Sequence, residues 1–253
     1  MTEWIGARPA AGPEPESRSG QVRRLFEAKA AGWPAKYAPD GRLSGRLAVL
    51  TTVLRGQLRP GGRLLDLGCG TGELARAAAA AGARVIACDI AVEMLRRAAG
   101  RDPGGAVEWV TLDPGWRTLP FRTAAFEVVV AASVLEYVDD PAIVIGECAR
   151  VLRPGGVMLC TVPDPWNPVR WLERAVSLAA RTRPAAAAAR RWPRLDDYLV
   201  YLSLSRHRHG SPWWHGIAGR AGLRPIQVPA GSRGHPPLRL LMFWRSAGPG
   251  ELP

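Results

Sequence analysis

The chain has 253 residues, of which 47% are hydrophobic; this suits one large domain with a core and excludes global disorder. Lys and Arg number 34 against 22 Asp and Glu, a net charge of +12. Residues 1–140 hold 18 basic and 16 acidic side chains, whereas residues 141–253 hold 16 and 6. Such an excess is typical of proteins that bind nucleic acid, membranes or acidic substrates, but also of an arginine-rich coding bias.

Residues 1–20 are rich in Pro, Gly, Ser and Glu and predict a disordered tail without the apolar core of a signal peptide. No run reaches the ~20 apolar residues that a membrane span needs. The cysteines lie in or beside apolar segments, form no CxxC pair and indicate neither disulfides nor a metal site: Cys69, Cys88, Cys148 and Cys160. We therefore expect a cytoplasmic protein with free thiols.

Residues 21–58 predict N-terminal helices from about Gln21 and over 43–58, with a Pro/Gly loop at 33–42 between them. Apolar runs and amphipathic segments then alternate. The strands are expected at Arg63–Leu67, Arg84–Asp89, Val107–Asp113, Phe126–Ala132 and Val157–Val162. Helices are expected between them at about Gly72–Ala81, Ala91–Ala99 and Asp140–Leu152, with Asp140 as an N-cap.

This alternation predicts an α/β fold, a doubly wound, seven-stranded, mostly parallel sheet whose core spans 59–163. Residues 164–222 interrupt the pattern with prolines and aromatic residues and predict a helical cap followed by the last core helix. Residues 223–246 predict the final two strands, the last of them antiparallel. Right-handed crossovers would place the functional loops at the carboxyl ends of the strands.

The most informative segment is a glycine-rich turn between the first strand and its helix. The strand ends in Asp66, and Gly68, Gly70 and Gly72 follow at alternate positions. Such a turn lets the backbone approach a ligand, and the helix N-terminus attracts an anion; a plain tight turn would have similar glycines. A dinucleotide site would need glycine where Glu73 stands.

The pattern Asp-x-Gly-x-Gly-x-Gly resembles motif I of the class I S-adenosylmethionine (SAM)-dependent methyltransferases, in particular those of ubiquinone and menaquinone biosynthesis. Asp89 ends the second strand 21 residues after Gly68, the spacing expected of a carboxylate that binds a ribose. An Asp that caps the following helix would occupy the same position. Leu119-Pro120-Phe121 and the segment 126–138 match later family segments. The resemblance implies SAM as cofactor, bound by Asp66, Gly68, Cys69, Gly70, Gly72, Asp89, Ile90, Met94, Asp113, Ala132 and Ser133.

Few residues are candidates for a catalytic base. His207, His209 and His215 lie in the inserted region, although RHRHG also reads as a solvated loop. Tyr137 follows the fourth strand and is either an acceptor contact or a packing residue. In related enzymes an N-terminal aromatic segment closes over SAM, which makes Trp33 and Tyr37, with Tyr137, candidates for a lid and acceptor site.

We expect methyl transfer to a small-molecule acceptor, a hydroxyl of a quinone, natural product, sugar or lipid-linked intermediate. Two alternatives remain: an RNA methyltransferase that uses the basic C-terminal half, which lacks an appended RNA-binding module, and a SAM-binding protein without catalysis. A weak contact with a membrane surface is a further hypothesis. It rests on a helix whose basic face (Arg170, Arg174, Arg181) would lie opposite Leu172, Val176 and Ala179.

Overall fold

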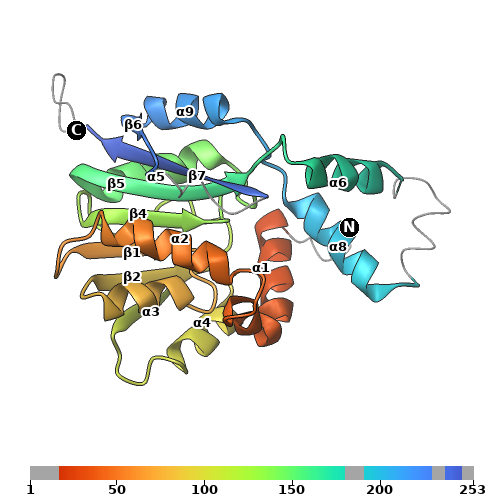
Figure 1. Cartoon of the computed structure of the whole chain (residues 1–253), viewed down its shortest axis with the longest axis horizontal. Coiled ribbons are helices and arrows are strands. Elements are labelled where there is room, and N and C mark those ends of the chain that lie inside the picture. Colours follow the sequence, from red (N-terminus) through yellow and green to blue (C-terminus); the bar gives the residue numbers. More distant parts are fainter. Residues whose placement is uncertain (1–16, 180–190, 230–236, 247–253) are drawn as a thin grey trace, which may run out of the picture.

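The computed structural model describes residues 17–179, 191–229 and 237–246. Seven strands form one sheet in the order β3-β2-β1-β4-β5-β7-β6 (Figure 1). The first five pair in parallel, and β7 runs antiparallel between β5 and β6. Their bounds are β1 Arg63–Leu67, β2 Arg84–Asp89, β3 Val107–Thr111, β4 Phe126–Ala132, β5 Leu152–Pro163, β6 Leu223–Ile226 and β7 Leu238–Arg245. The predicted doubly wound α/β fold is confirmed.

Both faces of the sheet are buried because the central strands are apolar at consecutive positions. In β4, Val128 and Val130 pack on one face with α2 (Ser44–Arg55) and α3 (Glu73–Ala80). Val129 and Ala131 pack on the other face with α5 (Pro141–Val151) and α9 (Ser211–Arg220). Helix α4 (Val92–Ala99) contacts the outer strands β2 and β3. Continuous apolar runs are typical of strands covered on both sides.

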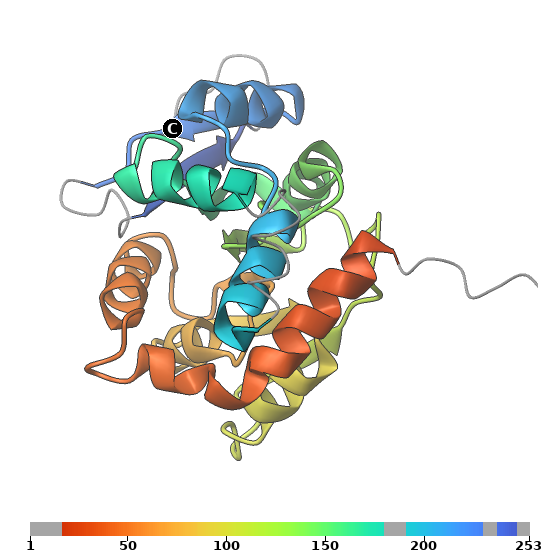
Figure 2. The same cartoon turned by 90° about the vertical axis from the view of Figure 1, so that its right-hand side faces the viewer.

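The N-terminal helix α1 (Arg18–Lys29) and the helix α8 (Pro193–Leu204) lie side by side beyond the carboxyl ends of the parallel strands (Figure 2). Short helical turns η1 (Ala30–Gly32) and η2 (Pro34–Tyr37) connect α1 toward α2, and α6 (Pro168–Ala179) follows β5. These elements cover this end of the sheet. The carboxyl ends of β1, β2 and β4 therefore face a covered space rather than bulk solvent.

The N-terminal helix begins earlier than the composition predicts. Ser17 caps it by accepting a hydrogen bond from the amide of Gly20 (3.2 Å), so residues 17–20 are ordered and the predicted tail is wrong for them. Residues 1–16 lie outside the described residues. The caps elsewhere agree: Asp140 accepts from the amide of Ala142 (2.8 Å), with Pro141 at the first helical position.

The basic face predicted for α6 is only partly exposed. Arg174 is exposed, but Arg170 is buried, and its guanidinium donates to Glu173 Oε2 at 2.6 Å. Leu172, predicted on the side opposite the arginines, is exposed. Arg181 lies outside the described residues. The helix therefore directs a charged pair inward, because Tyr198 and Arg208 also bind Glu173 there (3.0 Å each).

All four cysteines carry free thiols, and three are buried. Among the described residues, no helix combines the length and the apolar character that crossing a bilayer requires.

Candidate active site

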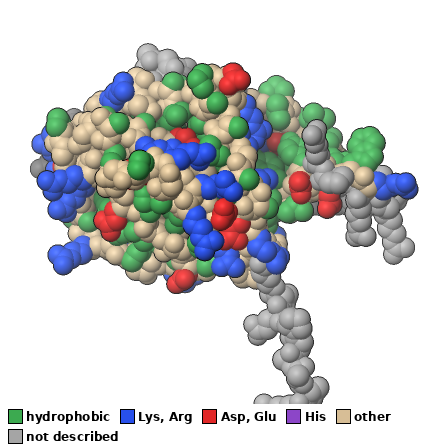
Figure 3. All heavy atoms as spheres, turned by 90° about the horizontal axis from the view of Figure 1, so that it is seen from below, with side chains coloured by type: hydrophobic (Ala, Val, Ile, Leu, Met, Phe, Trp, Pro, Cys, Tyr) green, Lys and Arg blue, Asp and Glu red, His purple; other side chains and the backbone are tan. Residues whose placement is uncertain are grey.

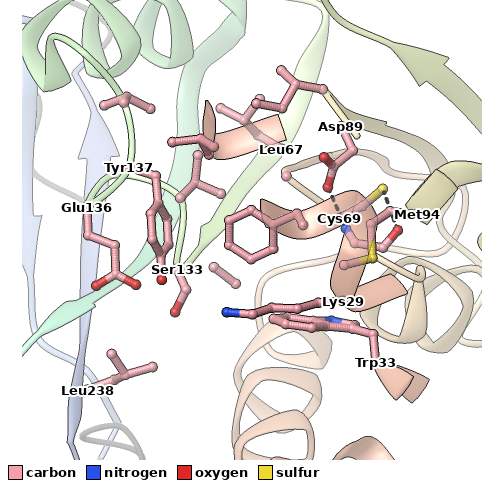
Figure 4. A pocket seen from close by; sticks show the side chains of 18 of the residues that line it. Lys29, Trp33, Leu67, Cys69, Asp89, Met94, Ser133, Glu136, Tyr137 and Leu238 are labelled. Atoms are coloured by element: carbon pink, nitrogen blue, oxygen red, sulfur yellow. Dashed lines mark hydrogen bonds between the residues drawn. The ribbon is translucent and has the colours of Figure 1, made fainter. Parts of the chain in front are cut away.

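A cavity of about 700 Å³ lies at the carboxyl ends of β1, β2 and β4, beneath α1, η2, α6 and α8. Figure 4 shows its two halves: Asp89, Cys69 and Met94 lie on one side, and Glu136 and Tyr137 on the other. Lys29 and Trp33 lie between these halves, toward the N-terminal helix. A volume of this size lies within the range of small-molecule sites.

The glycine-rich turn forms the floor of the first half. Gly68, Gly70 and Gly72 all have left-handed backbones, with φ between 56° and 77°. A Cβ on Gly68 would lie 2.3 Å from Val134, so glycine is required there by packing. A Cβ on Gly70 would have Nε1 of Trp33 as its nearest neighbour, at 3.2 Å, so this position faces the cavity and the N-terminal segment.

Two carboxylates flank the turn. Asp89 Oδ2 accepts the amide of Gly70 (2.8 Å), and Oδ1 accepts the amide of Ala91 at the start of α4 (2.9 Å). Each oxygen of Asp89 keeps a second lone pair for a hydroxyl donor, so capping and ligand binding are compatible here. Asp66 is buried, and its Oδ2 has no hydrogen-bond partner among the described residues. That oxygen is the natural acceptor for a cationic group of a ligand.

Burial, and next the negative charges of Asp89 and Glu73, raise the pKa of Asp66 to about 7. An unfolded Asp ionises near ~4. Between pH 4 and 7 the folded chain therefore keeps a proton that the unfolded chain has lost. The free energy of unfolding of the ligand-free chain should fall by about 4 kcal/mol across this window and stay level above it.

Asp66→Asn should remove this part of the pH dependence, which urea unfolding at pH 5 and pH 8 measures. The exposed Asp40→Asn is the matched control and should follow the parent. Equal pH slopes in the parent and Asp66→Asn would show that Asp66 is ionised throughout.

The loop after β4 forms the boundary between the halves. Ser133 holds a left-handed backbone, φ 58°, which is unusual for a residue with a side chain. Its amide donates to Thr161 Oγ1 (2.9 Å), which also accepts from Arg46 Nη2 of α2 (3.1 Å). Ala132 and Ser133 both line the cavity. A strained residue held by two neighbouring elements is typical of a functional site.

The second half contains a buried acid that the sequence reasoning did not single out. Glu136 lines the cavity yet is 2% exposed, and Ser205 Oγ donates to it (3.4 Å). Burial raises the pKa of its carboxyl group. The sequence signal was a lone carboxylate in the apolar run Val-Leu-Glu-Tyr-Val.

Tyr137 also lines the cavity and packs edge-on against Phe26 of α1, with ring centroids 5.1 Å apart. Tyr201 of α8 lies 6.1 Å away on another side. Burial raises the pKa of Tyr137 well above its ordinary value, so its phenol stays protonated. Tyr137 therefore packs against neighbouring aromatic rings and also faces the cavity, so both roles considered from the sequence are compatible with its position.

Both aromatic residues predicted for the lid line the cavity. Trp33 contacts Phe26 edge-on (5.6 Å) and lies under the ammonium of Lys36, 3.6 Å from the ring. Tyr37 lies beside it in η2. Because Trp33 also approaches Gly70, the N-terminal segment covers the glycine turn.

Most of the predicted cofactor-binding residues line the cavity, and two do not. Gly72 has its side-chain position filled by Trp109 and serves as the N-cap of α3. Asp113 is exposed and lies outside the cavity, whereas Leu112 and Trp116 beside it do line it. The cavity residues among those predicted are Asp66, Gly68, Cys69, Gly70, Asp89, Ile90, Met94, Ala132 and Ser133.

None of the three candidate histidines lines the cavity. His207 Nε2 pairs with the carbonyl of Val138 (2.9 Å), His209 stacks on Trp213 (3.7 Å), and His215 contacts a phenylalanine edge-on. The structure therefore does not support a base among them. Acidic residues do line the cavity, and they come from β1, β2, α3, the loop after β4, α6 and α8. Among the described residues no cluster could hold a metal ion.

Comparison with known proteins agrees with this geometry. A methyltransferase-domain family model matches residues 65–160, the span from β1 into β5. The demethylmenaquinone methyltransferase of Parafrankia sp. is 34% identical over 215 residues, which cover 75% of this chain and 80% of the relative. The ubiquinone biosynthesis O-methyltransferase of Xylella fastidiosa is 34% identical over 134 residues, 52% of this chain and 54% of the relative.

Among solved structures, magnesium protoporphyrin IX methyltransferase from Synechocystis PCC 6803 with bound SAH has the same fold. The TM-score is 0.66 at 18% identity, over 89% of this chain and 98% of that one. Three observations indicate the same family: the family model, the relative that covers three quarters of the chain, and the glycine turn at the cavity floor. The chain belongs to the class I SAM-dependent methyltransferases.

Proposed function

We propose that this SAM-dependent methyltransferase methylates a hydroxyl oxygen of a small, largely apolar acceptor of the quinol or phenol type. The observation that carries the proposal is the buried carboxylate of Glu136 in the second half of the cavity. Transfer to a hydroxyl releases a proton, and a nearby base is useful only for an acceptor that must lose one. The O-methyltransferase of ubiquinone biosynthesis and the demethylmenaquinone methyltransferase among the relatives support a quinone-like acceptor.

The residues of the first half fit SAM. Asp66 Oδ2, buried and without a partner among the described residues, suits the ammonium of its methionine part. The free lone pairs of Asp89 suit the two ribose hydroxyls. Ile90 and Met94 offer apolar contacts for the adenine. When bound, SAM supplies an electrophilic methyl group.

In this proposal Glu136 is the base that accepts the proton of the acceptor hydroxyl. Its raised pKa brings it closer to the pKa of a phenol, which makes proton transfer less unfavourable. Tyr137, protonated, orients the acceptor beside it, and Ser133 lies between this pair and the glycine turn. Ile143, Val144 and Leu238 line the same space and exclude water from an apolar ring.

Incubation with SAM labelled in its methyl group tests the proposal against a panel of quinols, phenols, matched quinones without a free hydroxyl, and total RNA. We expect label on the oxygen of the hydroxyl compounds and none on the matched quinones. Label on a ring carbon of the quinols or phenols would reassign the reacting atom to carbon, and label only on RNA would overturn the proposal.

The RNA alternative has less support than the net charge suggested. Arginines in residues 141–253 form internal ion pairs: Arg150 with Glu147, Arg153 with Glu127, Arg170 and Arg208 with Glu173, and Arg239 with Asp164. Paired guanidinium groups are less available to phosphates. Binding to RNA that weakens with added salt would restore this alternative. Location in the cytoplasm remains a prediction.

A further inference from the structure

Helix α6 turns its apolar side chains away from the protein. Trp171, Leu172 and Leu178 are 63–67% exposed, and Trp166, just before the helix, is 74% exposed. We call these four residues the α6 outer face. On the space-filling surface, hydrophobic side chains gather on the projecting part of the molecule that holds α6 and α8 (Figure 3). Such a concentration of large exposed side chains marks an interaction surface.

The helix is amphipathic, but its apolar side faces solvent and its charged pair faces the protein. At 100° per residue, Trp171, Ala175 and Leu178 follow one another on one face, and Leu172 lies beside them. The only acid of the helix, Glu173, is on the opposite side, 4% exposed, and forms a buried pair with Arg170. The pair is held by α8, so this orientation is fixed by the fold.

The chemistry of the α6 outer face fits a lipid surface. Tryptophan and leucine on a surface helix partition into the boundary between head groups and acyl chains. No acidic side chain of α6 is exposed to oppose anionic head groups, and Arg174 of the same helix is exposed.

The cavity opens beside the same face. Val169 of α6 and Tyr198 of α8 both line the cavity, yet they are 46% and 39% exposed. These two side chains therefore belong to the rim of an opening between the two helices. A surface bound by the α6 outer face would lie next to that rim.

We propose that the α6 outer face docks the protein on an anionic phospholipid bilayer and brings the cavity opening to the lipid surface. The binding does not depend on which acceptor the enzyme methylates. An apolar acceptor dissolved in the bilayer would then reach the cavity without passing through bulk water.

Flotation of the full chain with vesicles tests the proposal, using phosphatidylcholine alone and phosphatidylcholine mixed with phosphatidylglycerol. We expect the chain to float with the mixed vesicles. Trp171→Ser/Leu178→Ser, which changes no charge, should lower the partition coefficient by about 100-fold, about tenfold for each side chain. Trp213→Ser on α9, another exposed tryptophan, is the matched control and should float like the parent.

Unchanged melting and SAM binding in the double variant would show that its fold is intact. If melting falls, Leu172→Ser alone provides the comparison, with about a tenfold loss expected. Failure of the parent to float, or equal flotation of parent and variants, would overturn the proposal. So would a concentration-dependent dimer, seen by light scattering, that the double variant dissociates, because the face would then bind a second copy.

Discussion

Gly70→Val is expected to abolish SAM binding. Gly70 has φ 56°, where a β-branched residue is strongly disfavoured, and its Cβ would lie 3.2 Å from Trp33 Nε1. The side chain would also enter the first half of the cavity and disturb the amide that Asp89 accepts at 2.8 Å. Calorimetric titration with SAM should show at least a ~100-fold loss of affinity. The substitution changes both the cavity floor and the hydrogen bond between Gly70 and Asp89.

Gly82→Val separates this effect from backbone strain. Gly82 also has a positive φ, 90°, but a Cβ placed there would meet nothing within 4 Å, and the residue is outside the cavity. Both variants should lose stability by roughly 1–2 kcal/mol from the strained backbone, whereas only Gly70→Val should lose SAM. Asp89→Ala provides a second test of the same floor. Full affinity for SAM in both Gly70→Val and Asp89→Ala would refute this placement of the site.

Glu136→Gln is expected to lower kcat by about 100-fold to 10,000-fold on a hydroxyl acceptor, the range for loss of a general base. The change keeps the shape and removes the proton acceptor, so SAM affinity should not change. In the parent, activity should rise with pH through the raised pKa of Glu136, because only the ionised carboxylate accepts a proton. That acidic limb should disappear from the variant's pH profile.

Glu93→Gln is the matched control, since Glu93 is a partly exposed acid of α4 that forms ion pairs on the helix surface. It should keep the parent's rate and pH profile. A Glu136→Gln enzyme that retains the rate and the acidic limb would show that the acceptor ionises without Glu136. The proposed function would then rest on the transfer assay alone.

The parallel sheet can be predicted closely because its signals are local. The predicted bounds of β1, β2 and β4 agree with the structure to the residue, since each strand contains a short apolar run and lies between turn residues. The glycine turn can be recognised for a similar reason: three left-handed positions in five residues leave little choice but glycine. The order of its flanking residues then indicates the cofactor.

The cover over the cavity is harder to predict because tertiary contacts decide it. Periodicity places Arg170 on one face of α6 but cannot tell that Glu173, Tyr198 and Arg208 will bury that face. The three histidines lie in the right part of the sequence, yet stacking on tryptophan and bonding to a carbonyl direct two of them elsewhere. Glu136 is hard to identify from the sequence because a single acidic residue in an apolar run forms no repeating pattern.

The position of α1 has a consequence for the order of events in a catalytic cycle. Its Arg18 donates to the carbonyls of Val138 and Leu204 (2.8 and 2.6 Å), while Phe26 contacts both Trp33 and Tyr137. One helix thus covers the cofactor half and the acceptor half together. A movement of α1 would therefore uncover both halves at the same moment, so that events at the cofactor half and at the acceptor half are coupled through one helix.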